Sequence, residues 1–174
     1  MRHVVVDTNV AVVANARSPQ ASPECIVSCC DRLLAVERGS LRLVLDARGT
    51  IFDEYLSQLS LAGQPGAGDL FMRWVHTNRY NPARCELVEV TETAGSGWRV
   101  FEEVPDDPDL EGFDRDDQVF VAVSRGCKAR PPVLNAVDSD WWDYERVLAR
   151  NGVTVRFVCE DKVSEWKAAR TQKA

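Results

Sequence analysis

Acidic residues recur along the chain where predicted strands end and predicted helices begin. The first, Asp7, directly follows the apolar run Val4-Val5-Val6 and precedes Thr8 and Asn9. The later acids are Glu54, Asp114, Asp116, Asp117, Asp138 and Asp140. Two carboxylates about 4 Å apart at an effective dielectric of about 20 repel by roughly 4 kcal/mol, so acids gathered in one place favour a bound cation. Carboxylate oxygens suit hard ions, and we expect a site for one or two Mg²⁺ or Mn²⁺ ions that hydrolyses phosphodiester bonds.

The order of predicted elements explains how distant acids meet. Strands alternate with helices, which predicts parallel βαβ units and an α/β fold, with helices on both faces of a mainly parallel sheet. The predicted strands cover residues 3–7, 41–46, 86–90, 132–138 and 153–158. The predicted helices run from the Ser22 cap to about Gly39 and over residues 50–61, 69–77, 116–125 and 141–150. Residues 63–68 are predicted to form a flexible turn, and residues 91–112 an irregular loop with one helical turn that serves as a lid or docking edge.

In such folds, ligands bind beyond the carboxyl ends of the strands. Asp7, Asp46 and Asp138 each end a predicted strand, so all three should lie on one edge of the sheet. Asp114, Asp116 and Asp117 open the helix that carries the apolar run 119–123. The helix dipole favours acids there, but three within four positions exceed what a cap requires.

Each candidate acid also has an ordinary structural role. Asp7 could cap a turn or helix, Glu54 could lie on a solvated helix face, and Asp140 could cap the helix that begins at Trp141. Helical periodicity favours Asp116 over Asp117, because Asp116 shares a face with the apolar residues 119, 120 and 123. One of Trp141 and Trp142 should pack on the sheet, which leaves the other open to base stacking.

Composition bounds the class of protein. The 174 residues suffice for a single domain spanning 1–174 with its own core, and the 45% hydrophobic and 28% charged content is typical of a globular protein. We expect no membrane span and no leader peptide, and hence a cytoplasmic location. The net charge of −6 argues against a broad basic surface for nucleic acid, although cations in an acidic site would offset part of it.

The six cysteines contain no CxxC pair, and the two histidines are not spaced beside them as zinc ligands. We expect the cysteines to be small buried apolar residues in a reducing compartment. No histidine is placed to activate one as a nucleophile.

Four short motifs, in order, resemble the PIN domain family of magnesium-dependent nucleases, which includes toxins of toxin–antitoxin pairs and RNA-processing enzymes. The first is residues 4–10 (VVVDTNV), the second is residues 51–55 (IFDEY), the third is residues 114–120 (DRDDQVF) and the fourth is residues 137–140 (VDSD). Residues 18–19 and 41–44 add weaker similarity, and the resemblance extends over roughly residues 3 to 160.

The resemblance implies a function and a set of roles. Asp7, Glu54, Asp117 and Asp138 would be the catalytic, metal-binding acids, with Asp116 and Asp140 as further ligands and Asn9 and Asp114 in support. Here the motif favours Asp117 where periodicity favours Asp116. Asp46 stands where the family usually has a small hydroxyl residue, and the region 63–112 is longer than in compact toxins. The implied activity is an endoribonuclease acting on single-stranded RNA, with an antitoxin protein and a second copy of the chain as implied partners.

Three other functions compete with this one. The first is a PIN-like module with weak or no catalysis that binds a protein or RNA partner. The second is a structure-specific nuclease that acts on DNA through the same acids. The third is a phosphohydrolase on an unrelated α/β fold, which the sequence Asp7-Thr8-Asn9 disfavours because aspartyl phosphatases commonly carry Asp-x-Asp after the first strand.

Overall fold

Five parallel strands form the central sheet of the computed structural model, which describes residues 2–62, 65–95 and 97–173. The strands are β1 (Arg2–Val6), β2 (Leu41–Asp46), β3 (Cys85–Val88), β4 (Val133–Asn135) and β5 (Val155–Phe157), in the spatial order β3-β2-β1-β4-β5. The helices are α1 (Thr8–Ala14), α2 (Pro23–Glu37), α3 (Thr50–Gln58), α4 (Ala67–Asn78), α5 (Gln118–Gly126), α6 (Ser139–Arg150) and α7 (Glu160–Lys173), with a 3₁₀ turn η1 (Pro108–Leu110).

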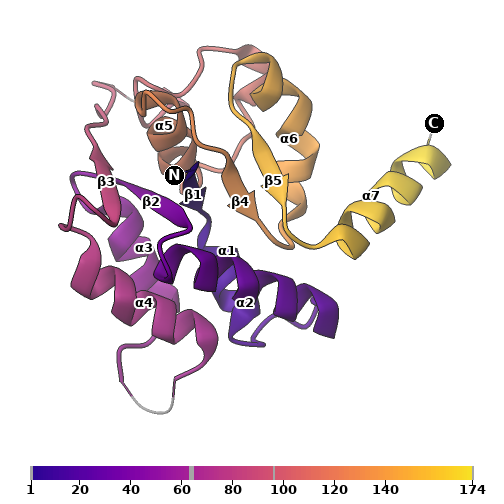
Figure 1. Cartoon of the computed structure of the whole chain (residues 1–174). Helices are drawn as coiled ribbons and strands as arrows, with labels where there is room; N and C mark the ends of the chain where they lie inside the picture. Colours follow the sequence, from indigo (N-terminus) through magenta and orange to yellow (C-terminus); the bar gives the residue numbers. More distant parts are fainter. Residues whose placement is uncertain (1, 63–64, 96, 174) are drawn as a thin grey trace.

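Helices flank the sheet, which confirms the predicted three-layer α/β/α architecture. In Figure 1, α1, α2 and α4 pack against one another below the strands, and α5 and α6 lie above them. Gly68 of α4 allows a close approach to α1, because a Cβ atom there would lie 2.0 Å from the carbonyl oxygen of Ala11. In the part of the chain that the structure describes, no helix is long and apolar enough to cross a membrane.

β1 is the central strand, and its sequence explains its place. Val4, Val5 and Val6 are all buried, so side chains on both faces of the strand enter the core. An uninterrupted run of valines fits a strand covered on both sides. Val4 pairs with Leu43 of β2, and Val6 pairs with Leu134 of β4.

Most predicted elements are present, with bounds that differ by a few residues at one or both ends. The Ser22 hydroxyl accepts a hydrogen bond from the backbone N–H of Cys25 at 3.1 Å, so it caps α2 as predicted. β4 ends at Asn135 rather than at Asp138, and α5 begins at Gln118 rather than at Asp116. Residues 63–64 of the predicted turn lie outside the described residues.

Two helices were not predicted from the sequence. The residues of α1, TNVAVVA, are rich in β-branched types that favour strands, but Asp7 caps this helix and its apolar side chains enter the core. α7 extends away from the body of the molecule (Figure 1). It is anchored by Trp166, whose ring lies 5.9 Å from that of Trp142 and 5.7 Å from that of Phe157.

The loop predicted over residues 91–112 has more structure than expected. Glu92 and Phe101 form an antiparallel bridge, and the backbone N–H of Thr93 donates to the carbonyl of Val100. We call residues 91–104 the hairpin; Ser96 within it lies outside the described residues. The predicted single helical turn is present as η1.

The cysteines differ from the expectation of a wholly reduced set. Cys25 of α2 and Cys159 before α7 form a disulfide, with Cα atoms 4.8 Å apart although 134 positions separate them in sequence. This pairing could not be foreseen because it depends on how the last strand brings Cys159 back to α2. Cys29, Cys85 and Cys127 are free and buried, as expected.

Candidate functional site

The strand order places a reversal point between β1 and β4. From β1 the chain continues to β2 and β3 on one side, and β4 and β5 add to the other side. In open α/β sheets, the crevice beyond the carboxyl ends of the strands at such a point is the usual ligand site. Asp7 directly follows β1, Asn135 ends β4, and Asp138 lies three residues further on.

Asp7 is the most deeply buried of the candidate acids, with 3% of its surface exposed. Its Oδ1 atom accepts a hydrogen bond of 2.9 Å from the backbone N–H of Asn9 and so caps α1. Its Oδ2 atom is buried and has no hydrogen-bond partner. Burial raises the pKa of Asp7 to about 7, and the charges of Asp138 and Glu54 add to the rise, although the Asn9 hydrogen bond opposes it.

Asp117 stands at the N-terminal cap position of α5 and is half-buried. Burial raises its pKa to about 9, with further contributions from Asp7, Asp138 and other nearby acids. The charge of Asp7 contributes to the raised pKa of Asp117, so without a cation Asp117 retains a proton at neutral pH. Such a pair is what a divalent ion would relieve by replacing the proton.

Asp138 caps α6, because its Oδ1 atom accepts a hydrogen bond of 2.9 Å from the backbone N–H of Asp140. Partial burial raises its pKa, and the charges of Asp140 and Asp114 contribute. Glu54 projects half-buried from α3, whose register is fixed by the Tyr55 hydroxyl donating to the carbonyl of Val6 at 2.5 Å. Desolvation raises the pKa of Glu54 as well, helped by the charges of Asp116 and Asp114.

The remaining predicted acids form an exposed outer group. Asp114, Asp116 and Asp140 are exposed, and the Oδ1 atom of Asp114 accepts a hydrogen bond from the backbone N–H of Asp116. Through the interactions above, all seven predicted acids belong to one electrostatic network. The helical-face argument for Asp116 was wrong, because α5 begins two residues later and Asp116 does not lie on its periodic face.

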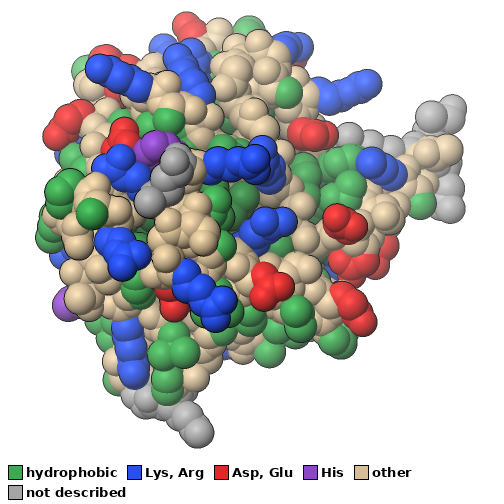
Figure 2. Space-filling view, in the orientation of Figure 1, with side chains coloured by type: hydrophobic (Ala, Val, Ile, Leu, Met, Phe, Trp, Pro, Cys, Tyr) green, Lys and Arg blue, Asp and Glu red, His purple; other side chains and the backbone are tan. Residues whose placement is uncertain are grey.

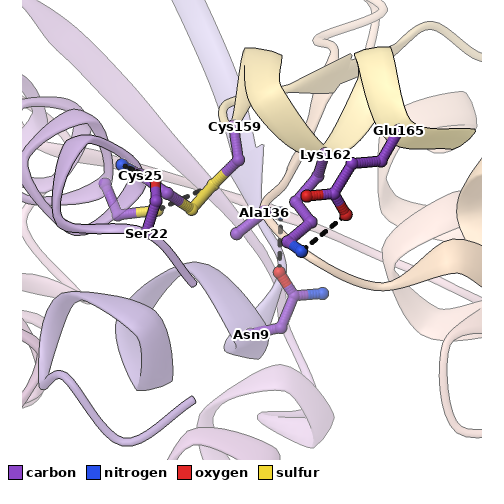
Figure 3. The surroundings of a disulfide bond; sticks show 8 residues. Asn9, Ser22, Cys25, Ala136, Cys159, Lys162 and Glu165 are labelled. Carbon is purple, nitrogen blue, oxygen red and sulfur yellow. Dashed lines mark hydrogen bonds and ion pairs between the residues drawn. A yellow bond between two sulfur atoms is a disulfide. The ribbon is translucent and has the colours of Figure 1, made fainter. Parts of the chain in front are cut away.

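Polar groups around Asp7 support the carboxylates. The Oδ1 atom of Asn9 accepts a hydrogen bond of 2.7 Å from the backbone N–H of Ala136, which ties α1 to the segment that carries Asp138 (Figure 3). The buried atoms Thr8 Oγ1 and Asn9 Nδ2 and both amide atoms of Asn135 have no hydrogen-bond partner. Buried polar atoms are usually paired, so this concentration beside Asp7 favours a site that binds something polar.

Asn135 was missed from the sequence, although it offered a signal. It is a polar residue inside the apolar run 133–137, and it is fully buried. The Asn135 amide lowers the pKa of Asp7, although its nitrogen makes no hydrogen bond of ordinary geometry. An amide directed at a buried carboxylate is a positioning group for that carboxylate.

Two residues considered from the sequence have structural roles instead. Asp46 is buried at the end of β2, and its two oxygens accept hydrogen bonds of 2.7 and 2.8 Å from the backbone N–H groups of Thr50 and Ile51. It therefore holds the start of α3 rather than joining the acidic network. Trp141 and Trp142 are both buried, with 0% and 8% of their surfaces exposed, so neither is placed to stack on a base.

The acids interact without touching. Among the described residues, Cys25, Cys29 and Cys159 are the one group of three or more His, Cys, Asp or Glu side chains close enough to share a metal ion, so the carboxylates of this network do not form such a group. Their oxygen-only donor set is nonetheless the kind that Mg²⁺ and Mn²⁺ prefer, and Mg²⁺ commonly binds through one or two carboxylates and several waters. The unpaired Oδ2 atom of Asp7 and the raised pKa values of Asp7 and Asp117 fit a bound cation.

Two hollows border the acids. One, of about 380 Å³, is lined by Asn9, Arg17 and Asp138 among others, and a second, of about 320 Å³, is lined by Glu54, Arg115 and Asp116 among others. Asp7 interacts with acids in both hollows, namely Asp138 and Glu54. A larger cavity of about 580 Å³ is lined by residues that include Arg2, Arg32 and Arg156 and none of the acids of the network. The unpaired Oδ2 atom of Asp7 and the raised pKa values of Asp7 and Asp117 lie in the acidic network instead. Figure 2 shows that Lys and Arg side chains also spread over the middle of one face of the molecule.

Burial raises the pKa of the Cys29 thiol to about 12 and that of the Cys85 thiol to about 11, so both stay protonated at neutral pH and are poor nucleophiles. The chemistry of the acidic network therefore does not depend on a cysteine.

Comparison of the chain with protein-family models, with curated proteins and with solved structures found no match.

Proposed function

We propose that the protein is a divalent-metal-dependent nuclease that hydrolyses phosphodiester bonds, with single-stranded RNA as its substrate. The observation that carries the proposal is the buried Asp7 carboxylate at the β1–β4 reversal point, with one unpaired oxygen and a pKa raised to about 7. Perturbed carboxyl groups in a crevice are typical of catalytic sites. The choice of RNA, and of an antitoxin as partner, rests on the four motifs that resemble PIN domains.

Four residues would hold the cation. Asp7 and Asp117 would bind it most directly, because their pKa values are raised to about 7 and about 9, and Asp138 and Glu54, whose charges add to the rise at Asp7, would assist. The cation would supply a bound water of lowered pKa and would neutralise charge that develops on the phosphate. The protein contributes positioning: the Asn9 backbone holds one oxygen of Asp7, and the Asn9 side chain holds the segment before Asp138.

Each of the two hollows has an arginine and an acid of the network in its lining. Arg115 borders the hollow at Glu54, and Arg17 borders the hollow at Asp138. A guanidinium group is suited to a phosphate oxygen, so each arginine can contact the backbone on one side of the cleaved bond. Arg115 is already held by the carbonyl oxygens of Gly97 and Trp98, and Arg17 by Asp69, so both are pre-positioned.

The test is cleavage of labelled single-stranded RNA and DNA by the purified protein with Mn²⁺, Mg²⁺ or EDTA. We expect metal-dependent cleavage of RNA that falls at least about 100-fold in Asp7→Asn and Asp117→Asn, since each removes a charge from the ion site. Glu54→Gln should lose activity, and Asp53→Asn, its exposed neighbour on α3, should retain it.

Three outcomes would contradict parts of the proposal. Cleavage of DNA but not RNA would show that the substrate is wrong and the catalytic site right. Cleavage that persists in Asp7→Asn would show that Asp7 is not part of the catalytic site. A folded wild type that binds Mn²⁺ but cleaves neither nucleic acid would instead favour a module that binds a partner.

A further inference from the structure

Three cysteine sulfurs meet between α2 and the start of α7, away from the acidic network. Cys25 and Cys29 lie four positions apart on α2 and so face the same direction from successive turns. Cys159 immediately precedes α7, and Figure 3 shows it opposite Cys25. The three sulfur atoms lie within 4.8 Å of one another, and each residue is no more than 1% exposed.

Their spacing fits a shared metal ion. Zinc bonds to thiolate sulfur are about 2.3 Å long, so two sulfurs on a tetrahedral zinc lie roughly 3.8 Å apart. The Cys29 and Cys159 sulfurs are 4.0 Å apart. The neighbouring Cys30 is turned away from the cluster, with its sulfur 3.7 Å from the carbonyl oxygen of Ala14.

A groove beside the cluster can complete the coordination. It has a volume of about 370 Å³ and is lined by Cys25 and Cys159 together with one cation, Arg32, and four carboxylates, Glu24, Asp31, Glu160 and Asp161, so its lining is net negative. Figure 2 shows acidic side chains gathered over α2 and the start of α7. These negative charges attract a cation, and the groove admits a water or a carboxylate as the fourth ligand.

We propose that the reduced protein binds one Zn²⁺ ion through Cys25, Cys29 and Cys159. The structure holds Cys25 and Cys159 as a disulfide, which a thiol reductant converts to two thiols while two reductant thiols join as a disulfide. Zinc then displaces three protons from the three thiols and forms three zinc–sulfur bonds. In either redox state, the sulfurs link α2 to α7, by a covalent bond or through the ion.

The test uses Co²⁺, which takes tetrahedral thiolate sites and absorbs light there by sulfur-to-metal charge transfer. The full-length protein is reduced with a phosphine, which becomes its oxide, and is then titrated without oxygen. We expect a near-ultraviolet band that saturates at about one Co²⁺ per chain and that Zn²⁺ removes. Cys29→Ser should bind Co²⁺ at least about tenfold more weakly, and Cys30→Ser should bind like the wild type.

Asp7→Asn separates this site from the acidic one, because oxygen ligands give no such band. We expect it to keep the full charge-transfer signal. Absence of the band in the reduced wild type, or equal affinity in Cys29→Ser, would overturn the proposal. Alkylation rates of the reduced wild type give a second readout that needs no variant: Zn²⁺ should slow alkylation of Cys25, Cys29 and Cys159 but not of Cys30, and equal slowing at all four would overturn it.

Discussion

Asp7 and Asp46 are two buried aspartates at the carboxyl ends of adjacent strands, but their surroundings differ. Both oxygens of Asp46 accept backbone hydrogen bonds from the start of α3, whereas Asp7 has one such bond and one unpaired oxygen. A hydrogen-bonded carboxylate stabilises a fold, and a desolvated one among like charges destabilises it. The same residue type therefore serves structure at β2 and is available for binding at β1.

The first prediction concerns the stability of the metal-free protein at neutral pH. Asp7→Asn should raise the free energy of unfolding, by on the order of 3 kcal/mol, because it removes a buried charge and keeps an oxygen to cap α1. Asp46→Asn should lower it by about 1–3 kcal/mol, because an amide offers only one acceptor to two N–H groups. Urea unfolding with EDTA measures both; the same sign for both substitutions would contradict this contrast.

The second prediction concerns pH. The folded pKa of Asp7 is about 7, above its ordinary value of about 3.9, so the folded state holds a proton that the unfolded state releases. The stabilisation that this proton gives the folded state is complete below about pH 4 and is lost as the pH rises to about 7. The raised pKa of Asp117 extends this loss of stability to about pH 9. Without metal, the wild type should thus become less stable relative to Asp7→Asn from pH 5 to pH 8. A constant difference between these two pH values would refute the assignment.

At the scale of elements, the start of α5 depends on the hairpin over residues 91–104. Gln118 is fully buried, and its side chain accepts a hydrogen bond of 2.7 Å from the backbone N–H of Val100 and donates one of 3.1 Å to the carbonyl of Trp98. Arg115 donates to the carbonyls of Gly97 and Trp98. The hairpin therefore fixes the turn that presents Asp114 and Asp117, rather than acting as a free lid.

The third prediction follows from this contact. Gln118→Ala should cost about 1–3 kcal/mol, since it leaves the Val100 N–H and the Trp98 carbonyl without their partner. Amide hydrogen exchange should become faster in residues 97–104 and at the start of α5, with little change in β1 and β2. Gln58→Ala, at the exposed end of α3, is the matched control and should leave both regions unchanged. Uniform acceleration over the whole chain would instead indicate a general loss of stability.

In the whole molecule, the fold brings together groups that repel one another. Asp7, Glu54, Asp117 and Asp138 follow or belong to four different elements, so the packing of β1, α3, α5 and β4 brings their charges near enough to raise one another's pKa values. An ion that binds only the folded state would stabilise it by offsetting this repulsion.

The fourth prediction is a thermal shift. Free Mn²⁺ at 100 times its Kd adds about 2.7 kcal/mol of stability, which for a chain of this length raises the Tm by roughly 5–10 °C. Asp7→Asn should lose most of this response, and Asp53→Asn should keep it. Differential scanning calorimetry with and without Mn²⁺ measures the shift. An equal response in wild type and Asp7→Asn would place the ion elsewhere.

Local sequence patterns predicted the α/β architecture, which the structure confirms. Alternating apolar runs and amphipathic segments predict βαβ units, and the valine run predicts a buried strand, because local periodicity reflects which faces are buried. Local pattern did not predict α1, because its β-branched residues favour a strand. The cap at Asp7 and the burial of its apolar side chains in the core make this segment a helix. Local pattern also did not predict α7, where the anchor is the contact of Trp166 with Trp142 and Phe157.

Contacts between residues far apart in sequence set which acids interact and which cysteines meet. Asp46 and Asp7 look alike in sequence, and they differ because the backbone N–H groups of Thr50 and Ile51 bind both oxygens of Asp46, while the Oδ2 atom of Asp7 has no hydrogen-bond partner. Asp117 is half-buried at the cap of α5 and Asp116 is exposed, because helix α5 starts at Gln118. Cys159 reaches Cys25 and Cys29 because β5 returns the chain beside α2. These outcomes depend on contacts between residues far apart in sequence, and local pattern carries no information about such contacts.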